Sequence, residues 1–153
     1  MKPRSRARAI ALQVLYETDI ANNHLPGEVL KRRLEEIPLA DDLAEFARRI
    51  VFGVLPITQD LDLLIAKYAP EWPLDQIAAI DRNILRIAFW EFAIYHETPV
   101  KVAINEAVEL AKLYGSDSAP RFVNGVLGTL VDHEGEIHQV IKNRLEHEPK
   151  MES

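Results

Sequence analysis

The chain has 153 residues, and its 18 basic and 24 acidic side chains give a net charge of −6. Hydrophobic residues make up 48% and charged residues 27%, a balance that excludes a wholly disordered or fibrous chain. There is no cysteine, which excludes disulfide frameworks, thiolate metal sites and cysteine nucleophiles. Taken alone, the negative charge argues against a nucleic-acid binder, because neutralising phosphates requires Lys and Arg.

The hydrophobic pattern predicts an all-α fold. Apolar residues recur at steps of three and four, and no stretch alternates with period two between hairpin turns. Helices are predicted over residues 4–21 and 26–37. A third is predicted over residues 41–68, where Pro56 removes a backbone donor and should kink the helix or split it in two.

Residues 70–73 contain two prolines and predict a boundary between two packed helical subdomains, a three-helix bundle and a C-terminal helical bundle. Beyond this boundary, helices are predicted over residues 81–96 and 101–113, with Gly115 as the cap of the second. The last main helix should begin at residues 118–120. We therefore expect one domain over residues 1–131, with approximate halves 1–69 and 74–131, and an acidic, solvated extension over residues 132–153.

Charge is strongly segregated along the chain. Residues 1–16 hold four basic side chains and no acid, a local charge of +4 that leaves −10 for the remainder. Arg4, Arg8, Leu12 and Tyr16 share one ridge of the first predicted helix, outside most of its predicted buried stripe. Arginines beside an aromatic side chain favour an RNA-facing surface. The alternative is a solvated basic end, with Tyr16 packed on a neighbouring helix.

A second ridge carries Arg82, Arg86 and Trp90 at helical spacing. Trp90 either stacks on Arg86 or packs inward. Glu91 lies between this ridge and an apolar stripe, and we expect it to pair with an arginine or a helix terminus, because burying it alone is costly.

Patterns for catalysis and metal binding are weak. Gly125 and Gly128 lack both the spacing and the lysine of a phosphate-binding loop, and there is no nucleophile elbow. His133, Glu134 and His138 come nearest to a metal cluster, but only Glu134 and His138 share a helical face. No apolar stretch is long enough to cross a membrane. We expect no enzyme activity, no cofactor, no metal and no membrane contact.

Four segments form an ordered set along the chain: residues 6–16 (RARAIALQVLY), 81–91 (DRNILRIAFWE), 102–112 (VAINEAVELAK) and 122–127 (FVNGVL). Together they resemble the NusB family of transcription antitermination factors, over roughly residues 3–130. The resemblance implies a cytoplasmic, non-enzymatic protein built from two helical bundles. It also implies binding to single-stranded boxA RNA together with NusE, a small-subunit ribosomal protein, and an indirect action on elongating RNA polymerase, notably in ribosomal RNA operons.

The resemblance also implies site residues. Positions that match the family's RNA-facing surface are Lys2, Arg4, Arg6, Arg8, Arg121 and Phe122, with Arg86 as a weaker candidate. Positions that match its NusE-facing surface are Tyr16, Asp75 and Asp81, which assigns Tyr16 to a protein contact. Asn105 and Asn124 lie within the motifs, where hydrogen bonding at helix ends or in the core is the expected role.

Two other functional classes and one oligomeric state remain open from the sequence. A helical scaffold would use the arginines to contact an acidic protein. A related domain also begins some ribosomal RNA cytosine methyltransferases, although these 153 residues leave no room for a methyltransferase domain. A homodimer would use the surface that otherwise meets NusE.

Overall fold

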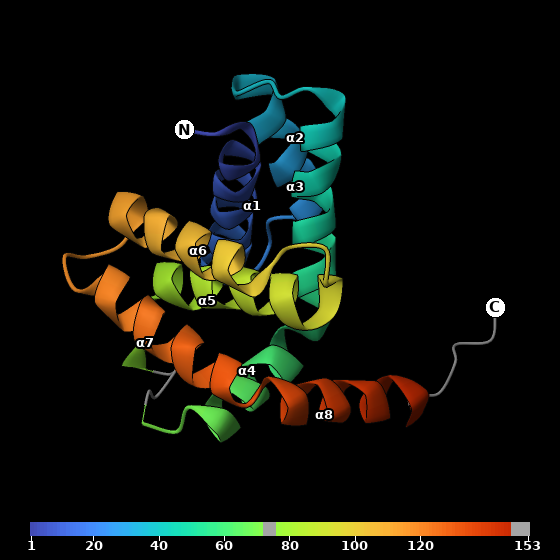
Figure 1. Ribbon diagram of the computed structural model, residues 1–153. Coiled ribbons are helices and arrows are strands. Elements are labelled where there is room, and N and C mark those ends of the chain that lie inside the picture. Colours follow the sequence, from blue (N-terminus) through green and yellow to red (C-terminus); the bar gives the residue numbers. More distant parts are fainter. Residues whose placement is uncertain (72–75, 148–153) are drawn as a thin grey trace.

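The computed structural model describes residues 1–71 and 76–147, the last three as backbone only. All regular structure in this described part is helical, which confirms the all-α prediction (Figure 1). The elements are α1 (Pro3–Ile20), α2 (Pro26–Glu36), α3 (Asp41–Val54), the 3-10 turn η1 (Leu55–Ile57), α4 (Thr58–Tyr68), α5 (Ala79–Trp90), the π turn η3 (Glu91–Tyr95), α6 (Val100–Tyr114), α7 (Ala119–Asp132) and α8 (Glu134–His147). None of the described helices is both long and apolar enough to cross a membrane.

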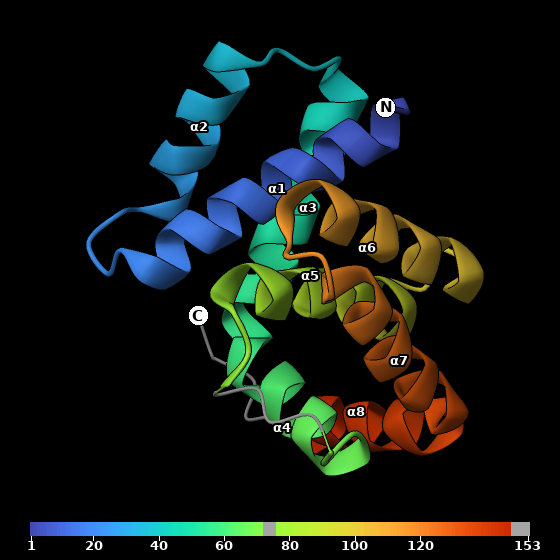
Figure 2. The same cartoon turned by 90° about the vertical axis from the view of Figure 1, so that its left-hand side faces the viewer.

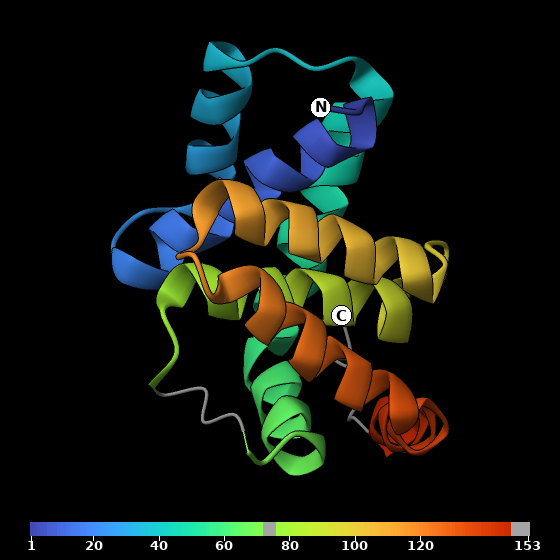
Figure 3. The ribbon, with the colours of Figure 1, turned by 60° about the vertical axis from the view of Figure 1, so that its left-hand side comes forward.

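Helix α5 is the centre of the fold. It packs against α1, α3, α4, α6 and α7, which surround it (Figure 2). Its side chains are buried nearly all round, from Ile84 to Trp90 without interruption. A helix that is covered on nearly every face lies inside the protein, so the other elements pack around it, and its buried polar side chains Asn83 and Arg86 hydrogen-bond to other residues. Helices α5, α6 and α7 also pack on one another (Figure 3).

The break at Pro56 occurs as predicted. Helix α3 ends at Val54, the 3-10 turn contains Pro56, and α4 begins at Thr58. The Thr58 Oγ1 hydroxyl donates to the Val54 carbonyl at 3.1 Å, which ties the start of α4 to the end of α3. The break redirects the chain, and α4 packs on α5 and α7 of the C-terminal bundle.

The helix predicted over residues 81–96 is α-helical only as far as Trp90. After Trp90 it widens into the π turn η3, and the turn ends at His96 in a left-handed conformation with φ 59°. The His96 backbone N–H donates to the Glu91 carbonyl at 3.1 Å. Trp90 packs inward and stacks on Tyr95, with ring centroids 4.8 Å apart. The inward alternative for Trp90 is therefore the correct one.

Gly115 caps α6 as predicted, but its backbone is extended rather than left-handed. A glycine is needed here for space. A Cβ atom at this position would lie 2.5 Å from the Ala119 Cβ and 2.9 Å from the Asp81 Oδ1. The loop between α6 and α7 is thus packed closely against the first turn of α5.

Helix α8 is packed, not a purely solvated extension as the sequence suggested. Ile137 is buried, and Val140 and Ile141 pack against the core. An ion pair between Arg144 and Asp60 joins α8 to α4. Three apolar residues at helical spacing are enough to hold an otherwise charged helix on the surface.

Candidate nucleic-acid interface

The first turn of α1 concentrates positive charge on the surface. Pro3 begins the helix, no acidic side chain lies in its first turn, and Lys2, Arg4 and Arg6 are exposed. The positive end of the helix dipole coincides with these cations, so neither the dipole nor a neighbouring acid in the turn offsets their charge. This arrangement favours an anionic ligand, and it agrees with the exposure expected for the three residues.

The structure corrects the placement of Arg8. This side chain is only 3% exposed, although the helical ridge it shares with Arg4 was expected to face solvent. Its guanidinium donates to both carboxylate oxygens of Glu91, and its Nη1 lies 3.6 Å from Glu106. Glu91, the first residue of η3, and Glu106 of α6 thus both pair with Arg8. Arg8 therefore holds the first turn in place and does not face RNA.

Arg86 is also an interior residue. Its Nη2 donates to Asp62 at 2.7 Å and its Nε donates to the same carboxylate at 2.8 Å, while Nη1 lies 3.3 Å from Asp19. Burial by itself lowers the pKa of Arg86, but these carboxylates outweigh that effect and raise it. Both carboxylates already neutralise the guanidinium, so the weaker RNA candidate is a link between α1, α4 and α5.

Helices α1 and α6 run side by side in the same direction. The Ser5 hydroxyl donates to Glu106 at 2.6 Å, and the Gln13 amide donates to the Tyr114 hydroxyl at 3.2 Å. A groove of about 630 Å³ lies along this seam and extends from Lys2 to Lys112. A second groove, of about 370 Å³, lies between the first turn of α1 and the segment before α6, and both Arg4 and Glu97 line it.

Arg121 and Phe122 are in α7, at a distance from the basic turn of about half the length of α6. Helix α7 begins beside the end of α6, so along the α6 axis these residues lie near Tyr114. Lys2 lies nearer to Glu106 along the same axis. Glu106 and Tyr114 are eight residues apart, which corresponds to about 12 Å along the helix axis. Arg121 is exposed and Phe122 is half-buried. The 630 Å³ groove extends from Lys2 along α6 to Lys112 and Leu113, and neither Arg121 nor Phe122 lines it.

Asn105 is a surface residue that sequence reasoning assigned to the wrong environment. It is exposed in the middle of α6 and lines the 630 Å³ groove together with Lys112. Asn124 is exposed in the middle of α7. Neither is at a helix end or in the core, so the expected hydrogen-bonding role is wrong for both. The available signal was the position of Asn105 beside Glu106 and one turn before Glu109, on the polar side of α6.

The candidate partner surface lies at the opposite end of α1. Tyr16 is 37% exposed and follows Gln13 by one turn. Beside it, Glu17 accepts hydrogen bonds from Arg32 and Arg33 of α2, and its carboxylate also lies 2.9 Å from His24. The Arg32 hydrogen bond is the main reason why the pKa of Glu17 is lowered, and burial opposes it. Tyr16 is thus an exposed aromatic residue next to the ion pairs that join α1 to α2.

Asp81 lies near this end of α1 but is buried, with 7% of its surface exposed. It is in the first turn of α5, and its Oδ1 has no hydrogen-bond partner in the described part of the chain. Burial raises the pKa of this carboxyl. A partner would reach only its edge, next to Gly115. The third expected partner residue, Asp75, lies outside the described residues.

The histidines near the C-terminus make ring contacts. His133 packs on the Tyr68 ring with centroids 5.2 Å apart, and His138 meets His96 edge to face at 5.4 Å. Among the residues that the structure describes, no three His, Asp or Glu side chains are grouped so as to hold a metal ion.

Comparison with known proteins gives one consistent match. The sequence model of the NusB family matches residues 5–149. The transcription antitermination protein NusB of Roseiflexus sp. (strain RS-1) is 54% identical over 130 residues, which cover 84% of this chain and 91% of that protein. The structure of T. maritima NusB matches with a TM-score of 0.75 at 30% identity, covering 90% of this chain and 92% of the other. A crystal structure of the antitermination factors NusB and NusE in complex with dsRNA matches with a TM-score of 0.75 at 28% identity, covering 92% and 98%.

Proposed function

Because this chain belongs to the NusB family, we propose that it is a transcription antitermination factor that binds boxA-type single-stranded RNA together with a NusE-type ribosomal protein. The observation that carries the proposal is the exposed cluster of Lys2, Arg4 and Arg6 at the positive end of α1. The similar NusB and NusE assembly with dsRNA supports RNA and NusE as the two partners.

The RNA surface begins at the basic turn and follows the 630 Å³ groove toward Arg121 and Phe122. The cations bind phosphates, while Asn105 and the half-buried ring of Phe122 contact bases. A single strand suits this surface, because its unstacked bases are accessible to side chains in a shallow groove. The acidic remainder of the chain repels other nucleic acid and limits nonspecific binding.

The NusE surface comprises Tyr16, the edge of Asp81 and, from the sequence, Asp75. An exposed tyrosine flanked by ordered charges is a common anchor of a protein interface. Asp81 contributes its accessible edge and its negative charge, while its Oδ1 is buried and has no hydrogen-bond partner in the described part of the chain. The protein acts without catalysis, in the cytoplasm, and influences RNA polymerase indirectly through this complex, notably on ribosomal RNA operons.

Titration of fluorescent boxA RNA, against a scrambled RNA of equal length, tests the RNA role. The double variant Lys2→Ala/Arg6→Ala should weaken binding to boxA RNA and reduce the slope of log K against log salt by about 1.4, at about 0.7 per phosphate contact on a single strand. Lys31→Ala, an exposed charge on α2, is the matched control and should leave both quantities unchanged. Equal binding of the two RNAs together with an unchanged slope would refute the RNA role.

Pull-down with purified NusE tests the partner role separately. Tyr16→Ala should reduce NusE capture while leaving RNA affinity in the absence of NusE unchanged. Light scattering of the chain alone then distinguishes the homodimer, in which the same surface would meet a second copy. Capture of NusE without any preference for boxA RNA would favour the scaffold alternative instead.

A further inference from the structure

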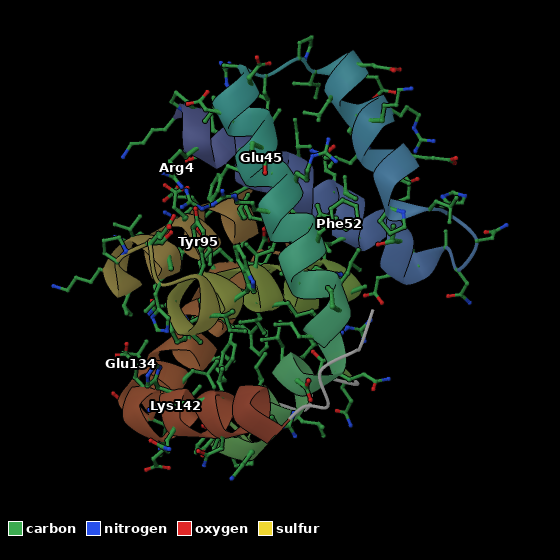
Figure 4. The ribbon with its side chains drawn as sticks, turned by 90° about the vertical axis from the view of Figure 1, so that its right-hand side faces the viewer. Arg4, Glu45, Phe52, Tyr95, Glu134 and Lys142 are labelled. Carbon is green, nitrogen blue, oxygen red and sulfur yellow. The ribbon has the colours of Figure 1, made fainter. Side chains whose placement is uncertain are left out.

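A third groove lies on the side of the basic turn that faces α3, and the function proposed above does not use it. We name it the Arg4–Tyr95 groove. It has a volume of about 300 Å³ and is formed by Arg4 of α1, Asp42, Glu45, Phe46 and Arg49 of α3, and Tyr95 of η3, with Leu43 at its base. Figure 4 shows the side chains of Arg4, Glu45 and Tyr95 on the same face of the molecule, each from a different element.

Two aromatic rings and a guanidinium form the walls of the Arg4–Tyr95 groove. The Arg4 guanidinium lies 4.1 Å from the centroid of the Phe46 ring. The Tyr95 ring is tilted against Phe46 at 6.1 Å and is supported from behind by Trp90. Flat groups held side by side in this way are the surfaces on which nucleobases stack.

An unusual backbone holds Tyr95 at this place. It is the last residue of the π turn, and His96 follows with a φ of 59°, the only non-glycine residue with positive φ in the described chain. Single π turns inside α-helices are frequent at functional sites, and left-handed non-glycine residues store backbone strain. A regular α-helix through residue 96 would turn Tyr95 about the helix axis and away from Phe46.

The charges in the groove favour a nucleotide over a simple anion. Arg4 and Arg49 face Asp42 and Glu45, so the lining carries no net charge. Glu45 is itself engaged, with one oxygen 3.7 Å from Arg48 and the other 3.7 Å from Arg49. The base of a nucleotide presents both donors and acceptors to such a lining, and the phosphate of the same nucleotide would reach the exposed guanidinium of Arg49.

We propose that the Arg4–Tyr95 groove binds one further nucleotide of the single-stranded RNA, with the base stacked against Tyr95 and Arg4 and the phosphate on Arg49. The inference rests on the proposed RNA function and extends it. Arg4 also lines the 370 Å³ groove, so the new subsite is continuous with the basic turn. The RNA path then runs over both sides of α1 and not only along α6.

Two adjacent arginines provide a matched test. Arg48 and Arg49 have nearly equal side-chain exposure, 56% and 55%, and pair with the same Glu45, but only Arg49 lines the groove. RNA affinity is measured for boxA RNA and for the same RNA with five uridines added at its 5′ or 3′ end. Arg49→Ala should remove one phosphate contact to one of the two extended RNAs. One contact contributes about 0.7 to the slope of log K against log salt, so the loss of affinity should be about fivefold larger at 0.1 M than at 1 M salt. Arg48→Ala should leave the affinity unchanged.

Photo-crosslinking supplies the second readout. 4-Thiouridine in the added segment should crosslink to the peptide that contains Tyr95, and Tyr95→Phe, which keeps the ring, should bind like the wild type. Equal effects of Arg48→Ala and Arg49→Ala, or crosslinks only to α6 and α7, would overturn the subsite. Loss of NusE capture in Arg49→Ala with unchanged RNA affinity would also overturn it, because the groove would then be a protein contact.

The proposed function fails in a different way from the subsite. If the wild type does not prefer boxA RNA, the RNA role itself is wrong. If Lys2→Ala/Arg6→Ala weakens binding and Arg49→Ala matches Arg48→Ala, only the additional nucleotide is wrong.

Discussion

Arg8 on α1 and Glu91 at the start of η3 form a two-pronged ion pair inside the protein, although they are far apart in the chain. The Arg8 Nε donates to Glu91 Oε2 at 3.0 Å, and Nη2 donates to Oε1 at 2.8 Å. Thr98 donates a further hydrogen bond to Oε1 at 3.0 Å, and the Glu91 side chain is fully buried. The pair fixes the basic turn of α1 over the π turn, and so positions both the exposed cations and the Arg4–Tyr95 groove.

Arg8→Ala should destabilise the protein by about 3–5 kcal/mol, because it leaves the Glu91 carboxylate buried without its cation. Urea unfolding followed by circular dichroism measures this difference. Arg6→Ala, an exposed arginine two residues earlier, should change the free energy of unfolding by less than about 0.5 kcal/mol. Equal losses in the two variants would contradict a structural role for Arg8.

Gly53→Ala should cost about 1–3 kcal/mol, because a Cβ atom at this position would lie 2.5 Å from the Trp90 ring in a packed core. Gly128→Ala has the opposite expectation. No atom lies within 4 Å of its added Cβ, and the residue is inside α7, so alanine should stabilise the protein by about 0.4–1 kcal/mol. Thermal unfolding of both variants tests whether Gly53→Ala lowers the midpoint temperature and Gly128→Ala raises it. A destabilised Gly128→Ala would show that α7 is packed differently.

Glu17→Gln should lose stability at neutral pH and not in acid. The Arg32 hydrogen bond lowers the pKa of Glu17 in the folded protein. Its stabilisation is therefore present above the unfolded pKa and disappears as the pH falls through the folded value. Because Arg32 is exposed, solvent screens this ion pair and the difference in stability should be small. Urea midpoints from pH 7 down to pH 3 should converge for the two proteins, and a constant gap would be evidence against this ion pair.

Asp81→Asn should show the opposite pH dependence. Burial raises the pKa of Asp81, so the folded protein binds more protons than the unfolded chain in the acid range. Wild-type stability is therefore lost as the pH rises from the unfolded value toward the folded one, and the loss persists at neutral pH. The advantage of Asp81→Asn over the wild type should grow between pH 4 and pH 7 in urea titrations. If the stability of Asp81→Asn relative to the wild type decreased between pH 4 and pH 7, this prediction would be wrong.

Asp81→Asn also bears on the partner surface. A carboxylate that costs stability in the free protein is expected where a ligand later pairs with it. The neutral amide keeps the shape of the side chain, whereas a lysine would have to enter the space beside Gly115. Reduced NusE capture by a stable Asp81→Asn protein would support the pairing.

Local information was sufficient for the helical class, for the break at Pro56 and for the family. Apolar spacing, proline and ordered motifs are properties of short segments, and tertiary contacts do not change them. The basic first turn also belongs to this group, because Lys2, Arg4 and Arg6 are close together in the chain and are exposed as expected.

Only the tertiary structure decided which side of each helix is covered. Arg4 and Arg8 are one turn apart on the same ridge, yet Arg4 is exposed and Arg8 is buried, because Glu91 of η3 and Glu106 of α6 pair with Arg8. Helical spacing predicts which side chains share a face, but not which distant segment packs on it. For the same reason, the net charge of −6 concealed both the basic turn and the interior ion pairs. The charges are set by composition, and their roles are set by contacts between residues far apart in the chain.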